Sequence, residues 1–117
     1  MSLPWSNRDR EAVERILSVN PPPTNLCEEV ATQIVGVARR AGWDGRRRRV
    51  EIVEGFVAAQ YVLPKRWPGL GWQYHVLAET RAHGVDAITG ADGHPIGSYL
   101  QDLWEHADCL RLEMEED

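Results

Sequence analysis

The sequence predicts one α+β domain in which N-terminal helices pack on a small antiparallel sheet, with a further helix between the last strands. Apolar residues recur at helical spacing up to residue 42, and they alternate with polar residues in several later stretches. Turn residues at 81–84 join two of those stretches as an antiparallel hairpin. A chain of 117 residues is long enough for one core and too short for two.

The first helix begins at a capping signal. Ser6 followed by Asp9 is typical of an N-cap, and Val13, Ile16 and Leu17 then form one apolar stripe. The three prolines at 21–23 cannot continue a helix and predict an extended linker. We therefore expect residues 1–23 to be a helix with a proline-rich linker, and residues 24–117 to hold the candidate chemistry.

The second helix is the best defined element of the sequence. Asn25 with Glu28 has the form of a capping box, and Gly42 supplies the stop. The helix is predicted from an apolar stripe of Leu26, Val30, Ile34, Val37 and Ala41. Cys27 is thereby placed in the first helical turn.

Strands are predicted where the period changes to two after residue 45. Val50 and Ile52 alternate with charged neighbours, residues 72–80 and 85–89 form the arms of the hairpin, and Leu110 follows Cys109 in a last, buried strand. The apolar run at 56–63 fits a strand or a short helix, and a loop follows it at 64–71. The third helix, capped by Ser98, is marked by Tyr99, Leu100, Leu103, Trp104 and Ala107.

Composition and charge restrict the function classes. With 43% hydrophobic and 26% charged residues the chain has the composition of a soluble globular protein, and no apolar stretch is long enough to span a bilayer. The N-terminus lacks the basic and apolar regions of a secretory signal, so export would need another route. A net charge of -5 argues against nucleic-acid binding, and the run from Arg46 to Arg49 is interpreted as a solvated turn entering a strand.

Cys27 is the candidate nucleophile. A thiol in the first turn of a helix faces unpaired backbone N–H groups and the positive end of the helix dipole, and both stabilise a thiolate. The N–H of Cys27 with the Asn25 side chain would form an oxyanion hole, although capping alone also explains Asn25. Cys27 and Cys109 are too few for a disulfide scaffold, so Cys27 is expected to work reduced.

His75 and Asp86 would complete the constellation. In the predicted strand His75 shares a face with Gln73 and Leu77, so it need not be buried and could take the thiol proton of Cys27. Asp86, predicted as the second residue of the paired strand, would accept a hydrogen bond from the other ring nitrogen and fix the tautomer. A surface or structural histidine is the competing interpretation of His75.

Other chemistries have weaker signals. The cysteines and histidines form no Cys-x-x-Cys pair and no His pair at helical spacing, so no metal or other cofactor is expected. Gly69 and Gly71 precede a strand instead of joining a strand to a helix, which removes the main signal for a phosphate loop. Asp92 and His94 could compete for the roles in the triad, but a turn rich in Gly, Asp and Pro explains them.

The order of these motifs resembles that of the small papain-fold toxin domains at the C-terminal ends of bacterial polymorphic toxins. Such domains have Asn and Cys at a helix start, here Asn25 and Cys27 with Leu26 between them. A glycine-led strand with His follows, here residues 71–77, and then a strand with Asp, here residues 84–88. A Pro-x-Gly loop at 95–97 and a helix bearing Trp104 close the pattern, so the resemblance covers residues 21–112.

The resemblance implies a papain-like fold and a cysteine protease without a cofactor. The site residues expected are the catalytic Cys27, His75 and Asp86, the oxyanion or positioning groups Asn25 and Gln73, and the cleft residues Trp72 and Tyr74. It also implies an effector that a larger protein secretes or delivers, that acts on a target-cell protein in the target-cell cytoplasm, and that a cognate immunity protein restrains. A glutamine deamidase or transglutaminase would use the same triad.

Two interpretations belong to other classes. A non-enzymatic acidic binding or immunity protein would use exposed Trp43, Trp67 and Trp72 as interface anchors, and Cys27 would be an ordinary thiol. A nucleic-acid enzyme would use the arginine run, and its binding would depend steeply on salt.

Overall fold

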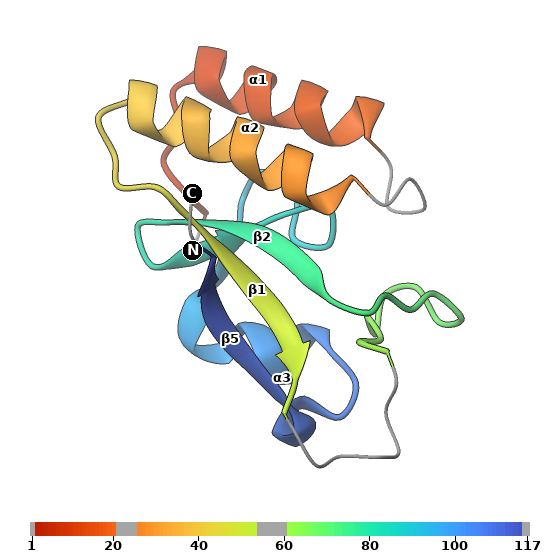
Figure 1. The fold of residues 1–117 in the computed structure, drawn as a ribbon. Coiled ribbons are helices and arrows are strands. Elements are labelled where there is room, and N and C mark those ends of the chain that lie inside the picture. The colour runs from red at the N-terminus through yellow and green to blue at the C-terminus, as the bar shows by residue number, and fades with distance from the viewer. Residues whose placement is uncertain (1, 21–25, 54–60, 116–117) are drawn as a thin grey trace.

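The computed structural model describes residues 2–20, 26–53 and 61–115, so the predictions for Asn25 and for residues 56–60 lie outside it. Three α-helices and a five-stranded antiparallel sheet confirm the predicted α+β class (Figure 1). Along the chain the elements are α1 (Asn7–Val19), α2 (Cys27–Arg40), β1 (Arg46–Ile52), β2 (His75–Thr80), β3 (His83–Val85), β4 (His94–Pro95), α3 (Tyr99–Leu103) and β5 (Leu110–Glu115). Short 3-10 helices, Ile96–Ser98 and Ala107–Cys109, flank α3.

The first two helices begin where the sequence predicts. The Ser6 hydroxyl accepts a hydrogen bond from the Asp9 N–H at 3.1 Å, which confirms the predicted cap of α1. Cys27 is the first helical residue of α2, as predicted, but the N-cap is Leu26, which makes no side-chain capping bond. The predicted capping box of Asn25 with Glu28 stays a prediction, since Asn25 lies outside the described residues.

The sheet has the strand order β4-β3-β2-β1-β5, and every neighbouring pair is antiparallel. Arg81 and Ala82 form the turn between β2 and β3, both with positive φ (51° and 59°), which matches the two-residue hairpin turn that fits the twist of a sheet. The predicted strand at 85–89 is wrong, because β3 ends at Val85 and the chain then turns. The predicted strand at 72–80 is shorter than expected, since β2 begins at His75.

The arginine run lies inside the sheet, so its prediction as a solvated turn is wrong. Arg46 to Arg49 belong to β1, which pairs with β2 on one side and with β5 on the other. Acidic partners stand on those flanking strands: Arg48 pairs with Glu79, and Arg49 pairs with Glu115 at 2.8 Å. The carboxylates of the neighbouring strands, which are remote in sequence, allow a central strand to carry this charge.

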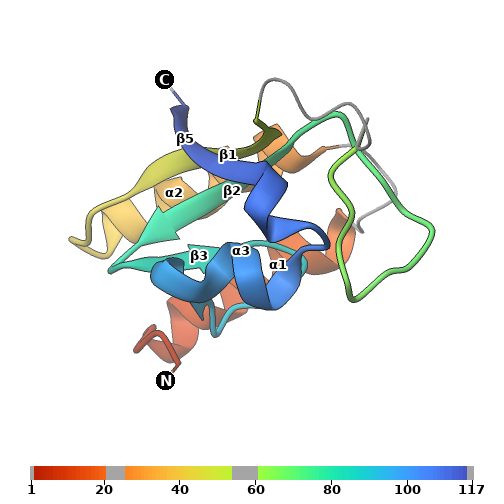
Figure 2. The same cartoon turned by 90° about the horizontal axis from the view of Figure 1, so that it is seen from below.

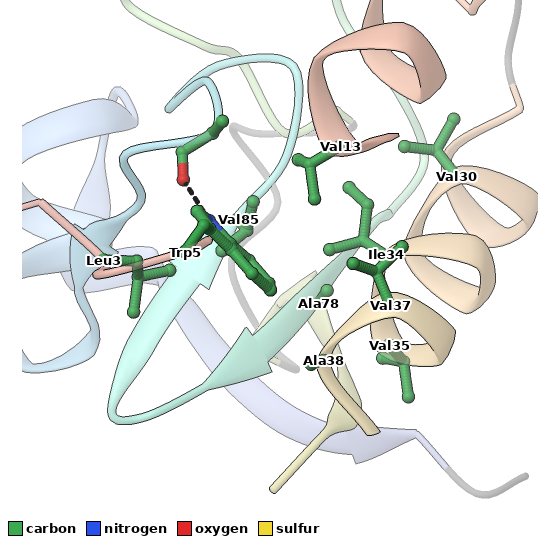
Figure 3. Packing of buried hydrophobic residues seen from close by; sticks show 11 residues of the cluster. Leu3, Trp5, Val13, Val30, Ile34, Val35, Val37, Ala38, Ala78 and Val85 are labelled. Atoms are coloured by element: carbon green, nitrogen blue, oxygen red, sulfur yellow. Dashed lines mark hydrogen bonds between the residues drawn. The ribbon is translucent and has the colours of Figure 1, made fainter. Parts of the chain in front are cut away.

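Two hydrophobic clusters cover the two faces of the sheet. α1 and α2 lie side by side on one face and α3 lies on the other, as Figures 1 and 2 show from two directions. On the first face Val13 of α1 and Ile34 of α2 pack with Ala78 and Val85 of the sheet (Figure 3). The second cluster comprises Val50, Val62, Leu77, Ile88, Tyr99, Trp104 and Leu110.

The N-terminal segment belongs to the first cluster. Leu3 and Trp5 are buried in it, and the Trp5 indole N–H donates to the Ala91 carbonyl at 2.7 Å (Figure 3). The start of the chain is therefore packed into the same core as α2 and the sheet. Among the described residues no helix has both the length and the apolar character needed to cross a membrane.

The third helix is shorter than its apolar pattern predicts. α3 ends at Leu103, and Trp104 continues in an extended conformation that bridges to Pro64. Ser98 stands at its N-cap without a side-chain capping bond. Cys109, predicted to lie in a buried strand, is half-buried in the 3-10 helix before β5.

Candidate active site

His75 is the first residue of β2 and is buried, only 5% exposed. It shares the face of Leu77, which packs in the second cluster. The expectation that His75 need not be buried is wrong, because one aromatic side chain from before His75 in the sequence and one from after it pack against its ring. The imidazole lies 5.5 Å from the Trp72 ring and 5.2 Å from the Trp104 ring, measured between centroids.

Asp86 follows β3 directly and closes a tight turn. Its Oδ1 accepts hydrogen bonds from the N–H groups of Ile88 and Thr89, each at 2.9 Å, while the Thr89 hydroxyl accepts from the Asp86 N–H at 3.0 Å. The carboxylate is 2% exposed. A side chain that bonds to the backbone two and three residues ahead ends a strand, and Asp-x-x-Thr before Gly90 is the sequence signal that could have predicted this turn.

The structure joins His75 and Asp86 directly. His75 Nε2 lies 2.9 Å from Asp86 Oδ2. Burial by itself lowers the pKa of His75, but the hydrogen bond to Asp86 and the interaction with Cys27 outweigh it and raise the pKa to about 9. For Asp86 the directions are reversed: burial raises the pKa of the carboxyl group, but the hydrogen bonds from His75 and Tyr99 outweigh burial, so the pKa is lowered. The pair is therefore held as imidazolium and carboxylate.

Cys27 also interacts with the imidazole. With Nε2 on Asp86, the buried Nδ1 of His75 has no hydrogen-bond partner of normal geometry among the described residues. Partial burial raises the pKa of the half-buried Cys27 thiol, but the interaction with His75 and the backbone N–H of Val76 lower it below the ordinary value. Catalytic hydrogen bonds are often long or poorly aligned before substrate binds. Nδ1 is thus the ring nitrogen left for the thiol.

Two residues of the site were not predicted from the sequence. The Tyr99 hydroxyl donates to Asp86 Oδ2, the same oxygen that His75 contacts, and Tyr99 is fully buried. Trp104 packs its ring between the imidazole and the rest of the second cluster. Both were predicted only as apolar positions of a helix, since helical spacing carries no information about which polar group a buried ring reaches.

A pocket of about 320 Å³ opens beside the Cys27 sulfur. It is lined by Cys27, Tyr61, Gly71, Trp72, Gln73 and Tyr74. Backbone hydrogen bonds in both directions between Val62 and Trp72 hold two of its walls together. A Cβ at Gly71 would lie 2.9 Å from Leu63 Cδ2 and 3.1 Å from Tyr61 Cβ, so a side chain here would require these neighbours to shift. Gln73, Trp72 and Tyr74, three predicted site residues, therefore lie beside Cys27.

The rim of this pocket is charged. The Tyr74 hydroxyl donates to Glu28 Oε1 at 3.0 Å, and the Arg49 guanidinium lies 4.4 Å above the Tyr74 ring. The bond to Glu28 raises the pKa of Tyr74, so the phenol stays protonated at neutral pH. Asn25, the remaining predicted positioning residue, lies outside the described residues.

The other candidates are engaged elsewhere. Asp92 pairs with Arg10 at 2.6 Å, and His94 Nε2 lies 2.8 Å from Asp102 Oδ2. Within the described ranges no three His, Cys, Asp or Glu side chains are grouped so as to hold a metal ion. The exposed tryptophans expected of a binding protein are not found: Trp43, Trp67 and Trp72 are each half-buried, and Trp43 stacks on Trp5 with 4.5 Å between centroids.

The fold and the site define a small α+β domain in which a helix-start cysteine, a strand histidine and a turn aspartate meet beside a pocket. No family model, no curated protein and no solved structure matches the chain. A function must therefore be argued from the side chains of the site.

Proposed function

We propose that the protein is a thiol hydrolase of the cysteine-protease type, with Cys27 as nucleophile, His75 as general acid and base, and Asp86 as the residue that orients His75. The observation that carries the proposal is the buried His75, whose Nε2 is bound to Asp86 and whose unpaired Nδ1 is left for the Cys27 thiol. Burying two charged groups costs free energy, because both lose their hydration. Shifted pKa values of this kind are frequent at functional sites.

The reaction begins with attack of the Cys27 thiolate on an amide carbonyl carbon. Negative charge then develops on the carbonyl oxygen, and N–H groups of the first turn of α2, which have no partner within the helix, stabilise it, that of Cys27 among them. As the C–N bond breaks, His75 donates its Nδ1 proton to the leaving amine, and a thioester remains on Cys27. A water molecule that gives a proton to His75 hydrolyses the thioester and restores the pair.

The same thioester would form if the attacked carbonyl belonged to a glutamine side chain. The leaving group would then be ammonia, and resolution by water or by an amine would make the chain a deamidase or a transglutaminase. In the wider proposal the fold is papain-like, and the chain is the effector domain of a delivered toxin that acts on a target-cell protein in the reducing cytoplasm of that cell. A cognate immunity protein would then cover the pocket beside Cys27.

The experiment that tests the proposal has two parts. Iodoacetamide alkylation is followed against pH by mass spectrometry, and we expect Cys27 to react with an apparent pKa below that of a free thiol, an advantage that His75→Ala removes. A cell-lysate digest is then read for new peptide N-termini, for Gln converted to Glu, and for new isopeptide links. Cys27→Ala is the inactive control and Cys109→Ala the matched active one.

The outcomes separate the alternatives. New N-termini support a protease, whereas Gln-to-Glu conversion or cross-links that depend on Cys27 support the deamidase or transglutaminase. A Cys27 that reacts as an ordinary thiol with or without His75 would overturn the hydrolase and favour a binding protein.

A further inference from the structure

The hydroxyl of Tyr99 has no role in a Cys–His–Asp triad, yet it reaches the carboxylate that holds His75. Tyr99 lies in α3, is fully buried, and donates its hydrogen bond to Asp86 Oδ2. His75 Nε2 lies 2.9 Å from the same oxygen. Two donors therefore share one carboxylate oxygen in a site from which solvent is excluded.

The other carboxylate oxygen is already saturated by the turn. Oδ1 accepts from the N–H groups of Ile88 and Thr89, each at 2.9 Å. A carboxylate has about four acceptor positions, so the backbone and the two side chains fill them all. The backbone bonds to Oδ1 fix Asp86 within its own turn, and the Tyr99 hydroxyl contacts the oxygen that faces His75.

We propose that Tyr99 is a positioning residue of the site: its hydroxyl withdraws charge from Asp86 Oδ2, and so limits how firmly Asp86 holds the imidazolium form of His75. This inference rests on the proposed function of Cys27 and His75. A donor to a carboxylate oxygen makes it a weaker acceptor for its second donor. An imidazolium held less firmly releases its proton from Nδ1 more readily, and that proton is the one the leaving amine needs.

The proposal predicts that Tyr99→Phe leaves the alkylation of Cys27 nearly unchanged and slows turnover. Alkylation of Cys27 by iodoacetamide needs no proton from His75, so its rate near neutral pH should stay within about twofold of the wild type. The second inflection of that rate, at the pH where His75 loses its proton, should move up by about half a pH unit or more. Turnover of the substrate found in the lysate digest should fall by about twofold to threefold for a shift of half a pH unit, because His75 has become a weaker acid by that amount.

Matched variants distinguish this role from a merely structural one. Thr80→Val also removes a buried hydroxyl, one that donates to the Asp44 carbonyl at 2.5 Å, at the far end of β2. It should lower stability without moving the inflection. In an Asp86→Asn background Tyr99→Phe should change neither the inflection nor turnover further, because Tyr99 acts through Asp86.

A second measurement avoids dependence on one variant. With Tyr61 and Tyr74 replaced by Phe, Tyr99 is the remaining tyrosine of the chain. Incorporation of 3-fluorotyrosine then makes the Tyr99 hydroxyl a stronger hydrogen-bond donor. The second inflection of the alkylation rate should move to lower pH than in the same chain with ordinary tyrosine.

An inflection that stays in place in both tests, while the wild type shows the activated Cys27, overturns the role of Tyr99 and leaves the hydrolase standing. A wild type whose Cys27 behaves as an ordinary thiol overturns both.

Discussion

The two faces of the sheet are built on different principles. The residues of the first cluster, beneath α1 and α2, are all apolar. The buried polar groups on this face among the described residues include the Trp5 indole and the Thr80 hydroxyl, and each donates to a backbone carbonyl. The second cluster surrounds the buried ionised pair of His75 and Asp86. Apolar burial accounts for the stability of the first face. On the second face, a buried ion pair often contributes no more stability than apolar side chains of the same size. Stability alone therefore gives no reason for the pair of His75 and Asp86.

On the second face the burial of His75 is coupled to its proposed chemistry. Tyr99, Trp104 and Trp72 exclude water from the imidazole, which strengthens its hydrogen bond to Asp86. The same exclusion makes the pair vulnerable, because either partner left alone would be a buried charge. The following tests separate the two faces, beginning with the largest effect.

Cys27→Ala should abolish the catalysed reaction while changing the free energy of unfolding by less than about 1 kcal/mol, because the half-buried thiol packs little apolar surface. Activity is measured on the substrate identified in the lysate digest, and stability by urea unfolding. Cys109→Ala is the control and should keep full activity. Retention of activity in Cys27→Ala would remove the nucleophile from the proposal.

Asp86→Asn should lower turnover by about 10²- to 10⁴-fold, because an amide that donates to His75 Nε2 selects the wrong tautomer. The backbone N–H groups of Ile88 and Thr89 can still bond to the amide oxygen, so the turn should persist. Steady-state kinetics with a circular dichroism spectrum checks both statements. A fully active Asp86→Asn would show that His75 needs no orienting carboxylate.

His75→Ala and Ile34→Ala compare the two faces directly. His75→Ala leaves Asp86 as an unpaired buried charge, so we expect a loss of about 3–5 kcal/mol, together with a return of the apparent pKa of Cys27 to that of a free thiol. Ile34→Ala in the first cluster should lose about 2–5 kcal/mol and leave the Cys27 pKa unchanged. A pKa change in Ile34→Ala would mean that the faces are not independent.

The pH dependence of the second face follows from the direction of its pKa shifts. The pKa of His75 is raised to about 9, so its contribution to stability is fully present below the unfolded value of about 6.5 and is lost as the pH rises through 9. The pKa of Asp86 is lowered, so its contribution is present above about 3.9 and is lost as the pH falls through the folded value. The stability difference between wild type and Asp86→Asn should therefore shrink below about pH 4 in urea titrations.

NMR titration of His75 should show an imidazolium at pH 7, and a neutral ring there would contradict the pair.

The two cysteines give the smallest difference. Burial, with Asp108 nearby, raises the pKa of the Cys109 thiol, whereas that of Cys27 is lowered. At pH 7 we expect iodoacetamide to modify Cys27 at least about tenfold faster than Cys109. Peptide mapping after timed quenching measures both rates in one sample, and equal rates would count against activation of Cys27.

Local patterns in the sequence predicted the parts of the fold that local physics controls. The cap at Ser6 and the apolar stripe of α2 were confirmed, and so was the place of Cys27 at the start of a helix. These features depend on neighbours within one helical turn, so a single sequence carries them. The choice of His75 and Asp86 rested on residue type and order, because the predicted strand at 85–89 and the predicted exposure of His75 were both wrong.

What only the tertiary structure decided involves partners remote in the chain. The arginine run lies in a central strand because Glu79 and Glu115 stand beside it, and no local pattern announces those pairs. His75 is buried beside Trp104, which lies 29 residues further along the chain. Asp86 ends a strand because its side chain accepts the backbone N–H groups of a turn. A charge becomes reactive according to how much water and which donors surround it, and those are properties of the packed chain.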